Sequence, residues 1–435
     1  MPEDIKNLNK VSNFSRPFFL RVDRIASVIL GFFVVFTGPI HNNLLINFGG
    51  YYRLNFFDFF AIPIIFFSLI TYCLTYGFRI KRYEQFLFLS LIVVLFSKIL
   101  SLLVAEEVVT IQWAGIVRYV SSTLVLIYIL ANLLSSQKNR NFFMYGLVLG
   151  VTIESIGGLL NFISSRGTFG YFLSVSTTGL QMFLIFACMV AFVENYRRFL
   201  MVLITLFLCI CLFATASRSA LFGLGVIFVI ILLYALYSRR RLLRPIFAVT
   251  VIIATLLLIV RAAPWTIERL LWKIEAGIQL KETSVVERLV LGKVSINMFL
   301  QRPVTGIGSG GIKEQQKTII SLVQEFIPAY PGYRLTPHST IVGIIGETGI
   351  IGIIAYLLWL IAAISICRRA LSLSKKLNTR SKIFPTAASL WIIFGLTYGD
   401  LFAETSFYPI MNSLVGFVLG WLRDNKGHTV KTINN

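Results

Sequence analysis

The sequence predicts an all-α polytopic membrane protein with about 12 transmembrane helices and a large, partly helical outward loop between helices 9 and 10. Composition is the first reason: 57% of the 435 residues are hydrophobic and only 14% are charged, whereas globular proteins are about 25% charged. Runs of about twenty apolar residues, enough to cross a hydrocarbon core of about 30 Å, also recur along the chain. Each run must be helical, because backbone groups inside lipid have no water to bond.

The apolar runs place the individual membrane spans. The predicted spans are 22–39, 56–77, 86–104, 114–134, 142–163, 171–193, 199–216, 219–237, 246–262, 339–365, 385–401 and 407–422. They divide the chain into residues 1–262 with helices 1–9, a loop domain at 263–337, residues 338–422 with helices 10–12, and a tail at 423–435. The first span is expected to stay in the mature protein, since no small-residue cleavage site follows it.

Lys and Arg residues in the short connections indicate the orientation of the helices. They concentrate in alternate connections, for example at Arg79, Lys81 and Arg82, at 239–241 and between 368 and 382. These connections, and with them both termini, are therefore expected to be cytoplasmic. The net charge of +21 is attributed to this bias and to attraction to the phospholipid membrane, and no nucleic acid is expected as a partner.

The residue inventory predicts no cofactor and no metal site. All five cysteines lie in or beside apolar spans, and His41 and His428 have no acidic, Cys or His company that could complete a metal site. The sequence also has no glycine-rich phosphate loop of the ATP-binding kind. An ATP-driven machine is therefore not expected.

The outward loop is expected to contain three helical elements. The first is predicted by the apolar spacing of WTIERLLWKIEAGIQL, the second covers about 284–301, and the third covers 311–326. Between the second and third, RPVTGIGSGG places Pro303 at a helix end and provides Gly306 and Gly308 for a tight loop with exposed backbone amides. This loop is interpreted either as a plain turn or as a contact for an anion or a sugar.

Ionisable residues at the outward ends of the spans are the main functional candidates, because charges inside a bilayer are costly. Arg218, flanked by Ser217 and Ser219, lies in a polar break between two apolar spans. Its guanidinium suits a phosphate, and the alternative is a simple outside-facing turn. His338 begins the tenth span, where an imidazole opposite several arginines is suited to act as a general base.

Further candidates lie on neighbouring segments. Glu347 follows His338 in the same span and is expected to face the interior and pair with an arginine, in either a structural or a functional role. Lys98 and Arg118 lie near the outward halves of the third and fourth spans, so that either could face a shared cavity. The remaining candidates for contact with substrate are three arginines of the outward loop, Arg288, Arg302 and Arg334.

Three segments in a fixed order resemble one family. ATASRSALFGLG before a spanning helix, NMFLQRPVTGIGSGG in the outward loop, and PHSTIVGIIGETGIIGIIAYLL are similar to the O-antigen ligase and O-antigen polymerase superfamily of bacterial envelope glycosyltransferases. The resemblance implies an enzyme of the bacterial inner membrane with a periplasmic active site and a periplasmic loop domain. It also implies transfer of a glycan from undecaprenyl diphosphate, without a nucleotide sugar or a metal.

The resemblance also implies roles for individual residues. Arg218 and Arg288 correspond to the arginines that hold the diphosphate, with Arg302 in reserve for Arg288, and His338 corresponds to the residue that activates the acceptor hydroxyl. Two activities within the superfamily stay open: a ligase transfers to lipid A-core, and a polymerase transfers to a growing glycan. A lipid-linked oligosaccharide flippase is the alternative from another class, although the unusual charges gather toward one side of the membrane, as expected for a transferase.

Overall fold

Every regular element that the structure describes is helical. The computed structural model describes residues 22–34, 60–76, 80–104, 113, 116, 117, 119–164, 207, 210, 211, 268, 271, 272, 275, 276, 278, 279, 283–308, 311, 315–328, 340–376 and 408–433. No strand occurs among these residues. The prediction of an all-α protein is therefore confirmed for the described part of the chain.

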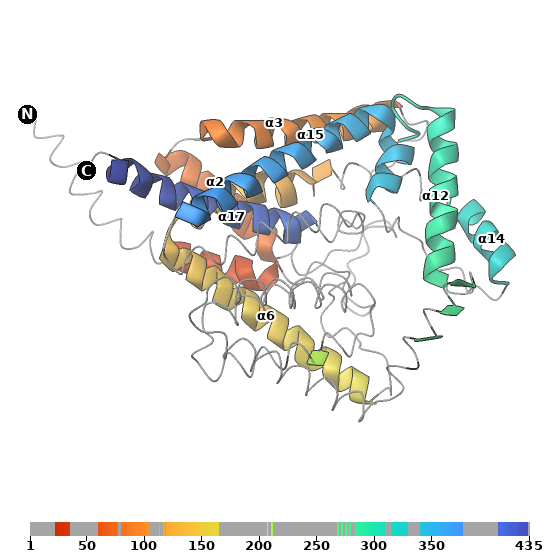
Figure 1. Cartoon of the computed structure of the whole chain (residues 1–435), viewed down its shortest axis with the longest axis horizontal. Helices are drawn as coiled ribbons and strands as arrows, with labels where there is room; N and C mark the ends of the chain where they lie inside the picture. Colours follow the sequence, from red (N-terminus) through yellow and green to blue (C-terminus); the bar gives the residue numbers. More distant parts are fainter. Residues whose placement is uncertain are drawn as a thin grey trace, which may run out of the picture.

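The helices of the described part follow one another in the order shown in Figure 1. They are α2 (Ile62–Tyr76), α3 (Arg82–Val104), the π-helix η2 (Val120–Val125), α5 (Leu126–Leu133), α6 (Gln137–Ser164), α12 (Thr283–Gln301), α14 (Gln316–Phe326), α15 (Thr340–Lys376) and α17 (Tyr408–Ile433). Residues 22–33 form a further helix before α2.

Three of these helices are long and apolar enough to cross a membrane. Their apolar stretches are Arg82–Val104, Gln137–Leu160 and Val342–Leu373, and they coincide with three of the predicted spans. The predicted spans 171–193, 219–237, 246–262 and 385–401, and most of 199–216, lie outside the described residues. The total of about twelve spans and the position of the loop domain on one side of the membrane therefore stay predictions.

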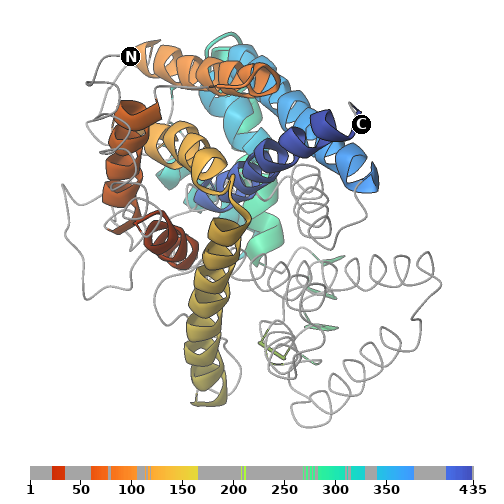
Figure 2. The same cartoon turned by 90° about the vertical axis from the view of Figure 1, so that its left-hand side faces the viewer.

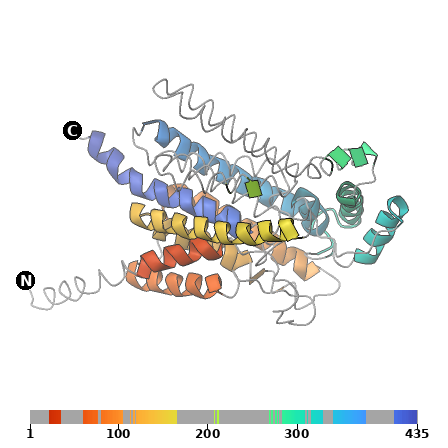
Figure 3. The same ribbon diagram turned by 90° about the horizontal axis from the view of Figure 1, so that it is seen from below.

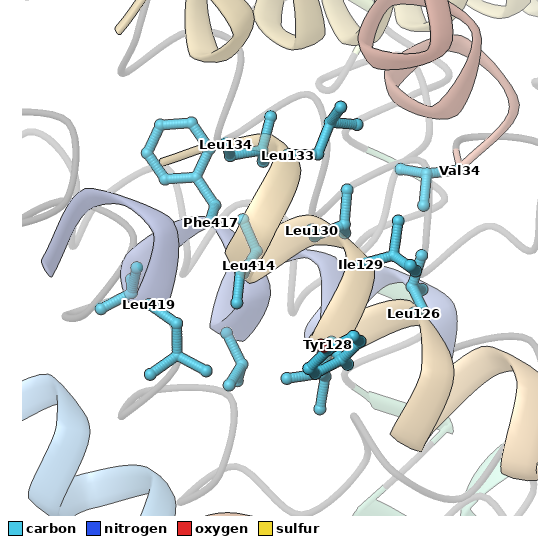
Figure 4. Close-up of a cluster of buried hydrophobic side chains, with 14 of the residues drawn as sticks. Val34, Leu126, Tyr128, Ile129, Leu130, Leu133, Leu134, Leu414, Phe417 and Leu419 are labelled. Carbon is cyan, nitrogen blue, oxygen red and sulfur yellow. The ribbon is translucent and has the colours of Figure 1, made fainter. Parts of the chain in front are cut away.

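The main core lies where α17 packs against η2 and α5. Leu126 and Leu130 of α5 and Leu414 and Phe417 of α17 are buried there, as Figure 4 shows. Gly416 permits the close approach, because a Cβ atom at this position would lie 2.6 Å from Cβ of Leu130.

A second, smaller core joins α12 to α14. Val290, Val294 and Met298 of α12 are buried in the same cluster as Ile319 and Val323 of α14. Figures 1 and 3 show that α12 lies across one end of α15, with α14 on its outer side. The predicted second helix of the outward loop is confirmed in α12, and the predicted third element is confirmed from Gln316 to Phe326.

Two ion pairs hold the opposite end of the bundle, where α3 begins and the buried part of α17 ends. Both carboxylate oxygens of the fully buried Glu84 accept hydrogen bonds from Arg423, at 2.7 Å from Nε and 2.5 Å from Nη2. Asp424 accepts a hydrogen bond of 2.6 Å from Arg140, which also donates to the carbonyl oxygen of Leu134. Burial by itself would lower the pKa of Arg423, but the hydrogen bonds and the charge of Glu84 outweigh this and raise the pKa above its ordinary value. Arg423 therefore stays charged at physiological pH.

Candidate functional site

The candidate site lies where α15 is interrupted and the glycine loop after α12 packs into the interruption. Gly349 has φ 60° and ψ −154°, far from helical values, although residues on both sides are helical. Figure 1 shows the short first part of α15 at a steep angle to the long second part. We call this region the helix-break junction; it comprises Ser101, Val104, residues 302–308 and residues 346–351.

The glycine loop replaces two hydrogen bonds that the interrupted helix cannot make. In a continuous helix the carbonyls of Gly346 and Glu347 would accept from the amides of Ile350 and Ile351. Instead these carbonyls accept from the amides of Ile307 and Gly308, each at 3.2 Å. In return, the amides of Ile350 and Ile351 donate to the carbonyls of Pro303 and Val304, at 2.9 and 3.3 Å. The carbonyls of Gly346 and Glu347 and the amides of Ile350 and Ile351 therefore all have hydrogen-bond partners, as buried backbone groups require.

This exchange corrects the expectation of exposed amides in the loop. The amide of Gly306 donates to the carbonyl of Arg302 at 2.9 Å, and those of Ile307 and Gly308 donate to α15. None of these three amides is available to an anion. Contact of Gly306 or Gly308 with substrate through other atoms stays a prediction.

Two glycines are required at this crossing. Gly306 and Gly349 have φ values of 67° and 60°, which residues with a side chain rarely adopt. A Cβ atom at Gly306 would lie 2.3 Å from the carbonyl carbon of Glu347, and one at Gly349 would lie 2.6 Å from the carbonyl oxygen of Pro303. The backbones of the loop and of α15 therefore touch directly.

The end of α3 is fastened to the same junction. The Arg302 guanidinium donates to the carbonyl oxygen of Val104, Nη1 to O 2.7 Å, and the Ser101 hydroxyl donates to the carbonyl oxygen of Glu347. Three helices far apart in the sequence, α3, α12 and α15, thus meet at one point. A change in any of them would alter the position of the others.

A small cavity lies beside the junction, between α3, η2, α15 and α17. Its lining includes Lys98, Tyr119, Thr348, Trp359 and Asn412, and its volume is about 40 Å³. That is room for water but not for a sugar ring. The Lys98 ammonium lies 5.8 Å from the centroid of the Tyr119 ring, so the ring face stabilises the cation within the bundle.

The π-helix η2 borders this cavity and is held by a buried amide. The side-chain nitrogen of Asn412 donates to the carbonyl of Ser122 and to the hydroxyl of Thr123, both at 3.0 Å. Asn412 lies on α17, so these two hydrogen bonds join α17 to the π-helix. This fixes the wall of the cavity that faces Lys98.

One comparison with known proteins bears on this region. A family model described as O-antigen ligase matches residues 203–357, about a third of the chain. The resemblance to the O-antigen ligase and polymerase superfamily is confirmed over these residues. The match includes the polar break around Arg218, the whole of α12, the glycine loop and the interruption of α15. No curated protein is significantly similar to the chain.

The predicted site residues separate into three groups. Arg302, Gly306, Gly308 and Glu347 meet at the helix-break junction, and Lys98 lines the adjoining cavity. Arg288 is exposed in the first half of α12. The remaining predicted residues lie outside the described part of the chain: Arg118, Ser217, Arg218, Ser219, Arg334 and His338.

The spacing of Arg288, on α12, and Arg302, directly after it, restricts their joint use. Arg288 and Arg302 are fourteen residues apart, which corresponds to about 21 Å along a helix with a rise of 1.5 Å per residue. A diphosphate group spans only a few ångströms. Arg288 and Arg302 are therefore too far apart along the chain to hold one group of that size together, and their predicted roles stay alternatives.

Sequence reasoning did not find three residues that shape the site: Ser101, Gly349 and Asn412. Ser101 and Asn412 are polar residues within apolar spans, and that placement is itself a signal of a structural or functional contact. Gly349 is the second glycine of IIGETGIIG, and a glycine within a helical pattern can mark a break. The residues that these three contact, however, are more than forty positions away in the sequence.

Replacing Gly349 by alanine should lower the stability of the protein by about 2–3 kcal/mol, because the residue adopts a conformation that is essentially restricted to glycine. The added methyl group would also meet the backbone of Pro303. Gly292→Ala is the matched control, since a Cβ atom there meets nothing within 4 Å. Thermal unfolding in detergent measures both variants, and equal midpoints would contradict the assigned backbone conformation.

Proposed function

We propose that the protein is a glycosyltransferase that moves a glycan from undecaprenyl diphosphate to a hydroxyl acceptor at the periplasmic face of the bacterial inner membrane, with O-antigen ligase activity. The observation that carries this proposal is the family match, which covers Arg218, Arg288, Arg302 and His338 in a single stretch of 155 residues. The proposal is also supported by three helices that are long and apolar enough to cross a membrane.

The proposed reaction is a displacement at the first carbon of the transferred glycan. The acceptor oxygen attacks this carbon and a new glycosidic bond forms. The bond from carbon to the diphosphate oxygen breaks, and its electron pair leaves with undecaprenyl diphosphate. The proton of the acceptor hydroxyl passes to the His338 imidazole, whose ordinary pKa of about 6.5 suits it to accept a proton near neutral pH.

Arginine side chains would balance the charge that develops on the leaving diphosphate. A guanidinium stays charged at all relevant pH values and binds two phosphate oxygens at once. In this proposal Arg218 acts together with either Arg288 or Arg302, and these arginines, if they lie near His338 as proposed, favour its neutral form. Arg302 is the arginine that the helix-break junction holds in place, through its bond to Val104.

Reconstitution of the purified protein in liposomes tests the proposal directly. With undecaprenyl diphosphate-linked glycan and lipid A-core, a ligase forms glycosylated core and no ladder when the core is omitted. A ladder of longer glycans from the donor alone would instead indicate polymerase activity. Movement of intact donor across the bilayer without a new glycosidic bond would refute the transferase assignment in favour of a flippase. Addition of EDTA is expected to leave the rate unchanged.

A further inference from the structure

A second cluster of basic residues lies at the end of the bundle opposite the helix-break junction. Lys81 precedes α3, Arg82 and Tyr83 begin it, and Arg369 lies in the last part of α15; together they line a pocket of about 450 Å³. The two helices pack along each other (Figures 1 and 2), so the pocket spans the start of one and the end of the other. The charge pattern of the sequence predicts this end to be cytoplasmic.

The limits of the apolar stretches place this pocket where lipid headgroups are expected. The apolar stretch of α3 that can cross a membrane begins at Arg82, and that of α15 ends at Leu373, four residues after Arg369. Phe86 and Leu89 are exposed and follow Arg82 on the same face of α3, at spacings of one and two turns. A molecule bound by its head in the pocket would therefore find an apolar surface for its tails.

Glu84, which follows the pocket residue Tyr83 and accepts a hydrogen bond of 3.1 Å from the backbone amide of Lys81, has its charge paired with another cation. Glu84 is fully buried and is paired with Arg423 through both of its oxygens. Within the described residues, no carboxylate pairs with the side chains of Lys81, Arg82 or Arg369. Three positive charges therefore line one pocket.

The Tyr83 ring also orients one of the three cations, Arg369. The guanidinium carbon of Arg369 lies 5.7 Å from the centroid of the Tyr83 ring, within the range of a cation–π contact. A guanidinium held on an aromatic face loses less freedom when it binds a phosphate. The pocket is thus better prepared for an anion than a set of mobile surface lysines would be.

We propose that this pocket binds the phosphodiester headgroup of an anionic glycerophospholipid, phosphatidylglycerol or cardiolipin. Basic pockets between membrane helices at the cytoplasmic side are suited to such headgroups, and the volume falls within the range of about 300–1,000 Å³ common for ligand sites. A zwitterionic headgroup carries no net charge and would gain less from three cations. This site is separate from the proposed glycosyl transfer and does not depend on it.

The test measures lipid binding by the full-length protein in detergent. Native mass spectrometry gives the affinities for phosphatidylglycerol and for phosphatidylcholine with matched acyl chains. The double variant Arg82→Gln/Arg369→Gln is expected to lose at least ten-fold in affinity for phosphatidylglycerol and to bind phosphatidylcholine as before. Arg368→Gln is the control: Arg368 is the exposed neighbour of Arg369, and it does not line the pocket.

Three outcomes would overturn the proposal. Equal losses in the control and in the double variant would mean that only the overall surface charge matters. Stabilisation by inorganic phosphate equal to that by phosphatidylglycerol, measured as a thermal shift, would assign the pocket to a free anion. If the double variant fails to fold, Lys81→Gln replaces it, because Lys81 is exposed; unchanged phosphatidylglycerol binding by that variant would also refute the site.

Discussion

Replacing His338 by alanine should lower the rate of glycan transfer by about 10²–10⁴-fold, the range typical for loss of a general base. The acceptor hydroxyl would then have to lose its proton to water while it attacks. Donor binding should change little, because the proposed diphosphate contacts come from arginines. The measurement is the transfer rate of reconstituted protein at saturating donor and acceptor, normalised to the amount of folded protein.

The matched control for this prediction is His41→Ala. His41 lies between the first two predicted spans, on the same predicted side of the membrane as His338, and has no assigned role. Its variant should retain full activity. A His338→Ala protein with normal abundance and unchanged transfer would end the assignment of His338, whereas equal losses in both variants would indicate a general effect of removing histidines from this face.

Replacing Arg423 by methionine should destabilise the protein by about 3–5 kcal/mol, which makes it the largest expected effect on stability. The change would leave the Glu84 carboxylate, which is fully buried, without its charged partner. Removing one member of a buried ion pair costs this amount because an uncompensated charge stays in a medium of low polarity. Thermal or denaturant unfolding in detergent measures the loss.

The double variant Glu84→Gln/Arg423→Met separates the ion pair from other contacts of Arg423. It removes both charges, so much of the stability lost in the single variant should return. Lys138→Met, which removes an exposed charge at the same end of the bundle, should change stability by less than about 0.5 kcal/mol. No recovery in the double variant would show that Arg423 stabilises the fold mainly by other means, such as its hydrogen bond to Asn132.

Much of the helical content could be predicted from the sequence, because span length and apolar composition are properties of each segment alone. The start of α15 at Thr340 lies one residue from the predicted start at 339, and α12 ends at Gln301, as Pro303 indicated. The end of α15 was less accurate. The helix continues to Lys376, beyond the predicted span end at 365, because the residues that follow the apolar run are helical as well.

The candidate site could be predicted from the sequence only in part. Arg302, Gly306, Gly308 and Glu347 were among the predicted candidate residues, and the structure brings all four to one junction. Their backbone partners could not be derived from the sequence, since a glycine-rich loop with bonded amides has the same composition as one with free amides. The decisive fact is the break at Gly349, which provides both the donors and the acceptors for the loop.

The sequence by itself determined the class of the protein, the helical segments, the predicted orientation and the family resemblance, because composition, apolar length and ordered motifs are all local along the chain. Only the tertiary structure decided which segments meet. The loop at 303–308 bonds residues about forty positions later, and Glu84 pairs with Arg423, 339 positions away. Such pairings depend on how the helices pack in three dimensions, and a buried charge or a broken helix is tolerated only where packing supplies the missing partner.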